Sequence, residues 1–155
     1  MCKSKFPYVF SIALALLVGA LSGLFVTGSM ATYYQLEKPA IAPPGIVFPI
    51  AWTILYVLMG ISSAIIYCSN HQNSKKALKI YALQLIINFF WSMLFFALEM
   101  RFLAFLWILL LIAVVAIMIV EFGDISKIAA RLQIPYLLWL FFAAYLNYSI
   151  WMLNR

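Results

Sequence analysis

Five long stretches of this chain contain no aspartate, glutamate, lysine or arginine, and this feature limits the possible folds more than any other. They cover residues 6–36, 39–74, 80–98, 102–120 and 132–154. A membrane-spanning helix needs about 20 mostly apolar residues to cross about 30 Å of hydrocarbon, so each stretch can supply one span. The composition agrees, because 68% of the residues are apolar and only 9% are charged.

These stretches predict an all-α membrane protein, a five-transmembrane-helix bundle that forms a single domain over residues 1–155. We expect helices near residues 6–26, 46–68, 79–98, 102–121 and 132–153. Strands of a membrane barrel are not expected, because the apolar runs do not alternate with polar residues. Residues 6–26 also resemble a signal peptide, but the run exceeds the usual apolar region of about 7–15 residues. We therefore expect the first helix to be retained.

The basic residues predict the orientation in the membrane. With five spans, the amino terminus and the second and fourth connections share one side, which carries seven of the ten cations. The other side carries Lys38, Arg101 and Arg155. The positive-inside rule then places the amino terminus in the cytoplasm of a bacterial cell and the carboxyl terminus outside. The net charge of +6 comes from these flanks, so we expect contact with membrane lipid and no nucleic-acid partner.

The connection between the first two helices differs from the others. Residues 27–45 read TGSMATYYQLEKPAIAPPG, which is longer than the about 4–6 residues of a typical connection and unusually apolar. Pro39, Pro43 and Pro44 restrict its backbone. It is either a loop in the headgroup region, where tyrosine is common, or a lid over the outer mouth of the bundle. The lid is favoured because long ordered loops tend to be functional.

The spans lack the residues that conventional catalysis requires. No span has the carboxylate or cation that coupled transporters usually need. His71, the only histidine, lies in the second connection, so the spans offer neither a Ser-His-Asp triad nor an imidazole ligand for a metal or haem. Cys2 and Cys68 have no metal-type spacing, and we expect free thiols. No metal site is predicted, and no cofactor is required.

Three predicted helices carry an aromatic and polar face. On the third, Gln84, Asn88, Trp91, Ser92 and Phe95 recur at helical spacing, and their amides would lose hydrogen bonds in lipid, so this face must turn inward. The second and fifth helices repeat the pattern with Phe48, Trp52, Tyr56 and Ser63, and with Pro135, Trp139, Ala143 and Asn147. Ordinary packing through interhelical hydrogen bonds is one explanation. A cavity with flat aromatic walls for a planar hydrophobic ligand is the other, and the three tryptophans favour it.

Small residues at four-residue spacing mark the first helix. Ala15, Gly19 and Gly23 allow close backbone approach, as do Gly60 and Ala64 on the second helix. The neighbour is either another helix of the bundle or a second protomer in a homodimer. We expect the contact within the bundle.

The chain resembles the TspO/MBR family, which comprises bacterial tryptophan-rich sensory proteins and the mitochondrial translocator protein, or peripheral benzodiazepine receptor. Three blocks carry the resemblance, in the expected order. They are Tyr33, Leu36-Glu37-Lys38-Pro39, Pro43-Pro44-Gly45, Phe48-Pro49, Trp52 and Leu55-Tyr56; then Gln84-Leu85, Asn88, Trp91-Ser92 and Phe95-Phe96; then Pro135-Tyr136-Leu137-Leu138-Trp139, Phe142-Ala143, Leu146-Asn147 and Trp151.

The resemblance implies a cavity beneath the first loop that binds porphyrins, notably protoporphyrin IX, and drug-like molecules. The implied lining residues are Tyr33, Pro43, Trp52, Asn88, Trp91, Ser92, Trp139, Ala143 and Leu146. A sensory or trafficking role in tetrapyrrole or stress regulation follows from the resemblance. The alternatives are light-dependent porphyrin degradation, with Trp52 and Trp139 as the reactive side chains, and transport of tetrapyrroles or sterols.

Overall fold

The charge-free stretches form long helices in the computed structural model, which describes residues 4–155. The elements are α1 (Phe6–Gln35), α2 (Val47–Cys68), α3 (Ser74–Ser92), the π-helix η1 (Met93–Ala97), α4 (Arg101–Ile125), α5 (Lys127–Leu132) and α6 (Ile134–Leu153). Five segments are long and apolar enough to cross a membrane, with η1 continuing α3 and α5 joining α6. No strand occurs in the described part of the chain. The predicted five-helix membrane bundle is therefore confirmed.

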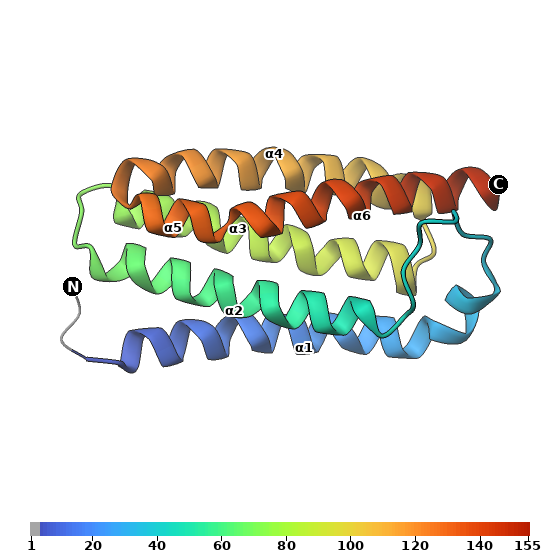
Figure 1. The fold of residues 1–155 in the computed structure, drawn as a ribbon, viewed down its shortest axis with the longest axis horizontal. Coiled ribbons are helices and arrows are strands. Elements are labelled where there is room, and N and C mark those ends of the chain that lie inside the picture. The colour runs from blue at the N-terminus through green and yellow to red at the C-terminus, as the bar shows by residue number, and fades with distance from the viewer. Residues whose placement is uncertain (1–3) are drawn as a thin grey trace.

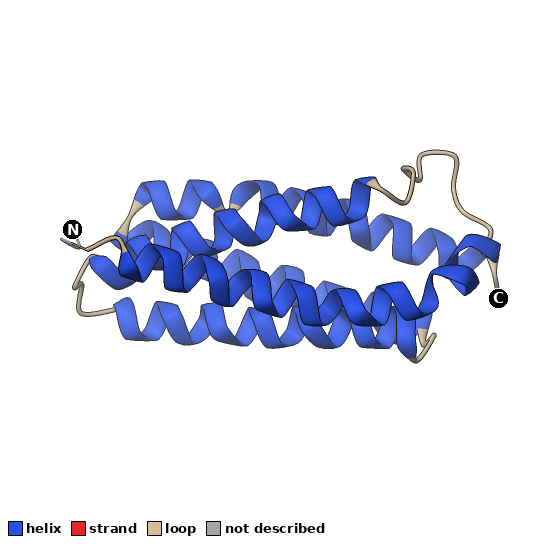
Figure 2. Cartoon of the chain, turned by 90° about the horizontal axis from the view of Figure 1, so that it is seen from below, coloured by secondary structure: helices blue, strands red, loops and turns tan. Residues whose placement is uncertain are grey.

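The helices run side by side along one long axis, and the start of α1 and the end of α6 lie at opposite ends of the bundle (Figure 1). α1 packs against α2 and α3, while α4 packs against α3 and α6. The connection between α1 and α2 crosses the end of the bundle where α6 finishes (Figure 2).

Four of the five spans extend beyond a predicted bound, and the predicted lid over 27–45 is wrong in its first half. Residues 27–35 continue α1, so the connection covers only residues 36–46. Thr27 does not interrupt α1, because its hydroxyl bonds to the carbonyl of Leu24 within the same helix at 3.2 Å. The third, fourth and fifth spans also continue past their predicted bounds, to Ser74, Ile125 and Lys127. A helix satisfies its own backbone and needs no lipid around it, so hydrophobicity does not fix where it ends.

Lys38 stabilises the end of α1. Its ammonium group donates hydrogen bonds to the carbonyls of Tyr33 and Leu36, both at 2.9 Å. The last carbonyls of a helix lack partners within the helix and carry partial negative charge, so a cation there is favourable. The same ammonium group lies 4.8 Å from the centre of the Tyr33 ring. Lys38 therefore fixes both the end of α1 and the orientation of Tyr33.

α1 and α2 approach each other closely in the half of the bundle that contains the amino terminus. A β-carbon on Gly60 would lie 2.5 Å from the α-carbon of Ile12, and one on Gly19 would lie 2.6 Å from the Tyr56 ring. Ala15 is fully buried in the same contact region. These three small residues thus act within the bundle, as expected. Gly23 differs, because a β-carbon there would meet no atom within 4 Å.

The expectation of a free thiol at Cys68 is wrong. Cys68 ends α2 and is disulfide-bonded. The expectation rested on spacing along the sequence, which does not report which distant segments lie together in space. Cys2 lies outside the described residues.

Candidate ligand-binding site

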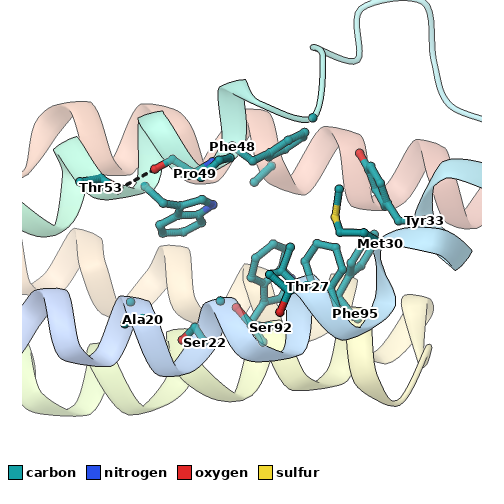
Figure 3. A pocket seen from close by; sticks show the side chains of 18 of the residues that line it. Ala20, Ser22, Thr27, Met30, Tyr33, Phe48, Pro49, Thr53, Ser92 and Phe95 are labelled. Carbon is teal, nitrogen blue, oxygen red and sulfur yellow. Dashed lines mark hydrogen bonds between the residues drawn. The ribbon is translucent and has the colours of Figure 1, made fainter.

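A cavity of about 570 Å³ lies in the half of the bundle near the α1–α2 connection (Figure 3). Residues of α1, α2, α3 with η1, and α6 line it, together with Gly45 of the connection. α4 contributes no lining residue and closes the bundle from behind. The volume falls within the range of about 300–1,000 Å³ that is typical of small-molecule sites.

The wall contributed by α1 consists mainly of small residues. Gly19, Ala20 and Gly23 line the cavity along successive turns, followed by Thr27 and Met30 towards the end of the helix. No atom lies within 4 Å of a β-carbon placed on Gly23, so the lack of a side chain there enlarges the cavity. Small residues of α1 therefore have two roles: those nearer its start pack against α2, and those nearer its end leave space for the cavity.

Aromatic rings form the walls opposite α1. The ring centres of Trp52 and Trp91 lie 6.1 Å apart with planes tilted by 35°, and Trp91 stacks on Phe95 at 5.8 Å and 23°. At the end nearest the connection, Tyr33 contacts the rings of Phe48 and Phe96 at 6.2 and 5.8 Å. Such offset and edge contacts are favourable arrangements of aromatic rings. The cavity is thus bounded by flat carbon surfaces on α2 and α3 and by Tyr33 at its outer end.

The π-helix η1 follows directly after Trp91 and Ser92. The amide of Leu98 donates to the carbonyl of Met93 at 2.9 Å, which is the five-residue spacing of a π-helix. π-helical turns within α-helices often occur at functional sites. Here the wider turn carries Phe95 and Phe96, both of which line the cavity.

A hydrogen-bond chain fixes the Trp91 ring. Its indole nitrogen donates to the side-chain oxygen of Asn147 at 3.1 Å, and the Asn147 amide nitrogen donates to the carbonyl of Arg101 at 2.8 Å. Asn147 is buried, so both bonds are shielded from solvent and lipid. The chain links α3, α4 and α6, and it holds one aromatic wall in a fixed orientation.

Six of the nine residues predicted for the site line the cavity. They are Tyr33, Trp52, Trp91, Ser92, Ala143 and Leu146. They come from four segments of the chain, and helical spacing had indicated most of their inward faces.

The other three predicted residues, Pro43, Asn88 and Trp139, are not among those that line the cavity. The Asn88 amide nitrogen donates to the Tyr56 hydroxyl at 3.0 Å. Asn88 therefore holds a lining residue in place without lining the cavity itself. Trp139 packs behind the lining, with its ring 6.5 Å from Trp52 and 6.1 Å from Phe48. Pro43 belongs to the connection above the bundle.

The sequence reasoning missed the wall contributed by α1. The four-residue spacing of Gly19 and Gly23 predicts helix packing, and no sequence pattern marks Ala20, Thr27 and Met30 as lining residues. A signal was present, because a row of small residues can face rows of aromatic residues across a cavity. The row alone does not distinguish that arrangement from tight helix packing.

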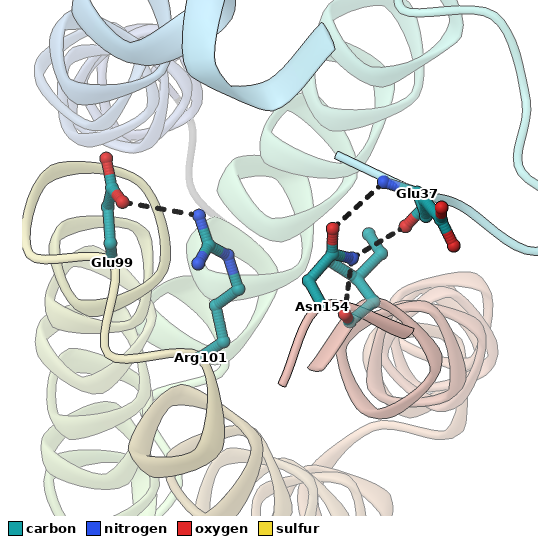
Figure 4. Close-up of polar contacts among 5 residues, drawn as sticks. Glu37, Glu99, Arg101 and Asn154 are labelled. Atoms are coloured by element: carbon teal, nitrogen blue, oxygen red, sulfur yellow. Dashed lines mark hydrogen bonds and ion pairs between the residues drawn. The ribbon is translucent and has the colours of Figure 1, made fainter. Parts of the chain in front are cut away.

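The α1–α2 connection is attached to the end of α6 by one side chain. The Asn154 oxygen accepts from the amide of Glu37 at 3.0 Å, and its amide nitrogen donates to the carbonyl of Glu37 at 2.9 Å. The same nitrogen contacts the carbonyl of Ile150 at 2.7 Å. Figure 4 shows these bonds beside the ion pair of Glu99 and Arg101. The Asn154 side chain thus pairs with both the N–H and the C=O group of Glu37, as the backbone of a neighbouring strand would.

Comparison with known proteins identifies the family. The TspO/MBR family matches residues 11–152. The tryptophan-rich protein TspO of Chlorobaculum tepidum is 33% identical over 99% of both chains, and that of Archaeoglobus fulgidus is 37% identical over 94% of this chain and 95% of its own. The human translocator protein is 35% identical over 84% of this chain and 80% of its own. The chain therefore belongs to the TspO/MBR family of membrane proteins.

Proposed function

We propose that this protein binds flat hydrophobic molecules, with protoporphyrin IX as the expected ligand, in the cavity beneath the α1–α2 connection. The observation that carries the proposal is the pair of indole rings, Trp52 and Trp91, on the wall of a cavity of about 570 Å³. A planar ligand gains most contact from planar walls held in fixed orientations. The Asn147 hydrogen bond to Trp91 supplies that rigidity.

The chemistry of the lining supports binding rather than acid–base catalysis. None of the residues that line the cavity is an aspartate, glutamate, lysine, arginine or histidine. The titratable side chains in the lining are the phenols of Tyr33 and Tyr56. A phenol stays protonated at neutral pH and is a poor match for general acid–base catalysis, which works best with a group that titrates near the operating pH. The names of two relatives, "Translocator protein" and "Tryptophan-rich sensory protein", support a trafficking or sensory role for the bound molecule.

The test is a titration of the protein in lipid nanodiscs with protoporphyrin IX, followed by the porphyrin's own absorption band so that tryptophan content does not affect the signal. We expect saturable binding that Trp52→Leu weakens by about ten- to a hundredfold, because losing the contact between the ligand and a large aromatic ring costs about 1.5–3 kcal/mol. Trp151→Leu is the matched control, since Trp151 packs on Phe102 and does not line the cavity. An unsaturable signal, equal to that of empty nanodiscs, would contradict the proposal.

We also propose that the end of the bundle containing the amino terminus faces the cytoplasm. Lys75, Lys76 and Lys79 begin α3 at this end, and Lys127 and Arg131 lie in α5 beside it. At the other end, Lys38 and Arg101 have partners within the protein. A green fluorescent protein fused after Arg155 should stay dark in bacteria, and alkaline phosphatase fused there should be active. The reverse pattern would contradict the orientation.

A further inference from the structure

The cavity opens sideways between α1 and α2. Four of its lining residues are exposed: Ala20 and Thr27 on α1, and Pro49 and Thr53 on α2. Figure 3 shows these two pairs on facing helices with the cavity between them. The helices are in contact near Gly60 and separate towards the connection. These four residues, called the rim below, therefore border an opening in the side of the bundle.

The rim lies on two membrane-spanning segments, and Ala20 lies deep within the first of them. Both helices belong to segments that are able to span the membrane, and Ala20 precedes the end of α1 by about 22 Å at 1.5 Å per residue. The surface beside the rim is apolar, with Leu24 66% exposed on α1, and with Ile50 and Ile54 both 56% exposed on α2. In a bilayer, acyl chains must cover such a surface.

The two hydroxyl groups of the rim donate to the protein and not to water. The Thr53 hydroxyl donates to the carbonyl of Pro49 at 2.7 Å, and the Thr27 hydroxyl donates to that of Leu24 at 3.2 Å. Both threonine hydroxyls thus donate within their own helices, which leaves the methyl groups to contact whatever surrounds the rim. Water that entered here would find few partners for its hydrogen bonds, while hydrocarbon needs none.

The cavity is long as well as apolar. On α1 its lining extends from Leu16 to Tyr33, which is about 26 Å along the helix axis. An apolar cavity left empty would forfeit dispersion contacts along its whole wall. We propose that a lipid acyl chain enters between α1 and α2 and occupies this cavity when no other ligand is bound. The proposal does not depend on whether the cavity takes a porphyrin.

The experiment uses a variant that retains Trp52 alone, with the other four tryptophans replaced by phenylalanine. In nanodiscs made from phosphatidylcholine with bromine atoms midway along the acyl chain, contact with the bromines quenches Trp52. We expect strong quenching by this lipid and none by iodide added to the water. Quenching by iodide but not by the brominated lipid would overturn the proposal, because water would then fill the cavity.

Two variants locate the quenching chain. Ala20→Phe with Thr53→Phe narrows the rim, and Leu21→Phe with Ile54→Phe is the matched control on adjacent exposed residues that do not line the cavity. We expect the rim variant to lose most of the quenching and the control to retain it. Equal quenching in both would show that the chain touches Trp52 from outside and would overturn the proposal.

Gly23→Leu keeps the proposal testable if the rim variant fails to fold. A β-carbon at Gly23 meets no atom within 4 Å, so a leucine side chain has room in the cavity without forcing α1 away from its neighbours. This variant leaves the rim open and fills the interior. We expect quenching of Trp52 to fall here too, and unchanged quenching would contradict an acyl chain inside the cavity.

Discussion

Gly60→Ala should destabilise the bundle although alanine is the better helix former. The new β-carbon would lie 2.5 Å from the α-carbon and 2.8 Å from the nitrogen of Ile12, whereas carbon atoms in contact prefer about 3.5–4.0 Å. Because the obstacle is backbone, α1 as a whole must move by about 1 Å. Such overpacking costs about 1–3 kcal/mol, and the gain in helix propensity returns only about 0.5–1 kcal/mol.

The net loss of about 1–2 kcal/mol corresponds to a melting temperature lower by about 2–8 °C for a chain of this size. Thermal unfolding in detergent micelles, followed by circular dichroism, measures it. Gly28→Ala is the control, since a β-carbon there meets nothing within 4 Å; its melting temperature should stay the same or rise. Adding Ile12→Ala should not restore stability, because the obstructing atoms remain. Equal melting temperatures for the Gly60 and Gly28 variants would refute the reasoning.

Two further predictions concern polar contacts around the cavity. Asn147→Leu leaves the buried Trp91 indole N–H without its partner, at about 1–3 kcal/mol, and also removes the bond to the Arg101 carbonyl. We expect a clear drop in melting temperature, and wild-type stability would contradict it. Asn154→Ala removes both bonds to Glu37. Because that contact is exposed, stability should change little while hydrogen exchange at the Glu37 amide accelerates, and unchanged exchange would show that the loop is held otherwise.

The spans could be predicted because hydrocarbon excludes charge so strongly that absence of charge marks each crossing. The ends of the helices could not. Thr27–Gly28–Ser29 resembles a break in the sequence, yet α1 continues to Gln35, because a helix bonds its own backbone wherever it runs. What ends α1 is Lys38 returning to the carbonyls of Tyr33 and Leu36, a contact that hydrophobicity does not encode.

Within the site, periodicity indicated the inward faces of the helices but not the neighbour that each residue meets. Trp52 and Trp139 both lie on inward faces, yet only Trp52 reaches the cavity and Trp139 packs behind it. The rotation of each helix about its axis decides between these positions, and it follows from packing against several neighbours at once. For the same reason, the difference between Gly19, pressed against Tyr56, and Gly23, beside open space, is visible only in three dimensions.

The contact between Glu37 and Asn154 also implies an order of assembly during biosynthesis, because the two residues are 117 positions apart in the chain. Chains emerge amino-terminal end first, so α1 and α2 can be in the membrane, joined at Gly60, while the residue that anchors their connection is still untranslated. The segment carrying Glu37 must wait until α6 arrives before it finds its partner. Closure over the cavity is then a late event of assembly, and the half-made protein would present Trp52 to the bilayer before α6 can close the wall beside it.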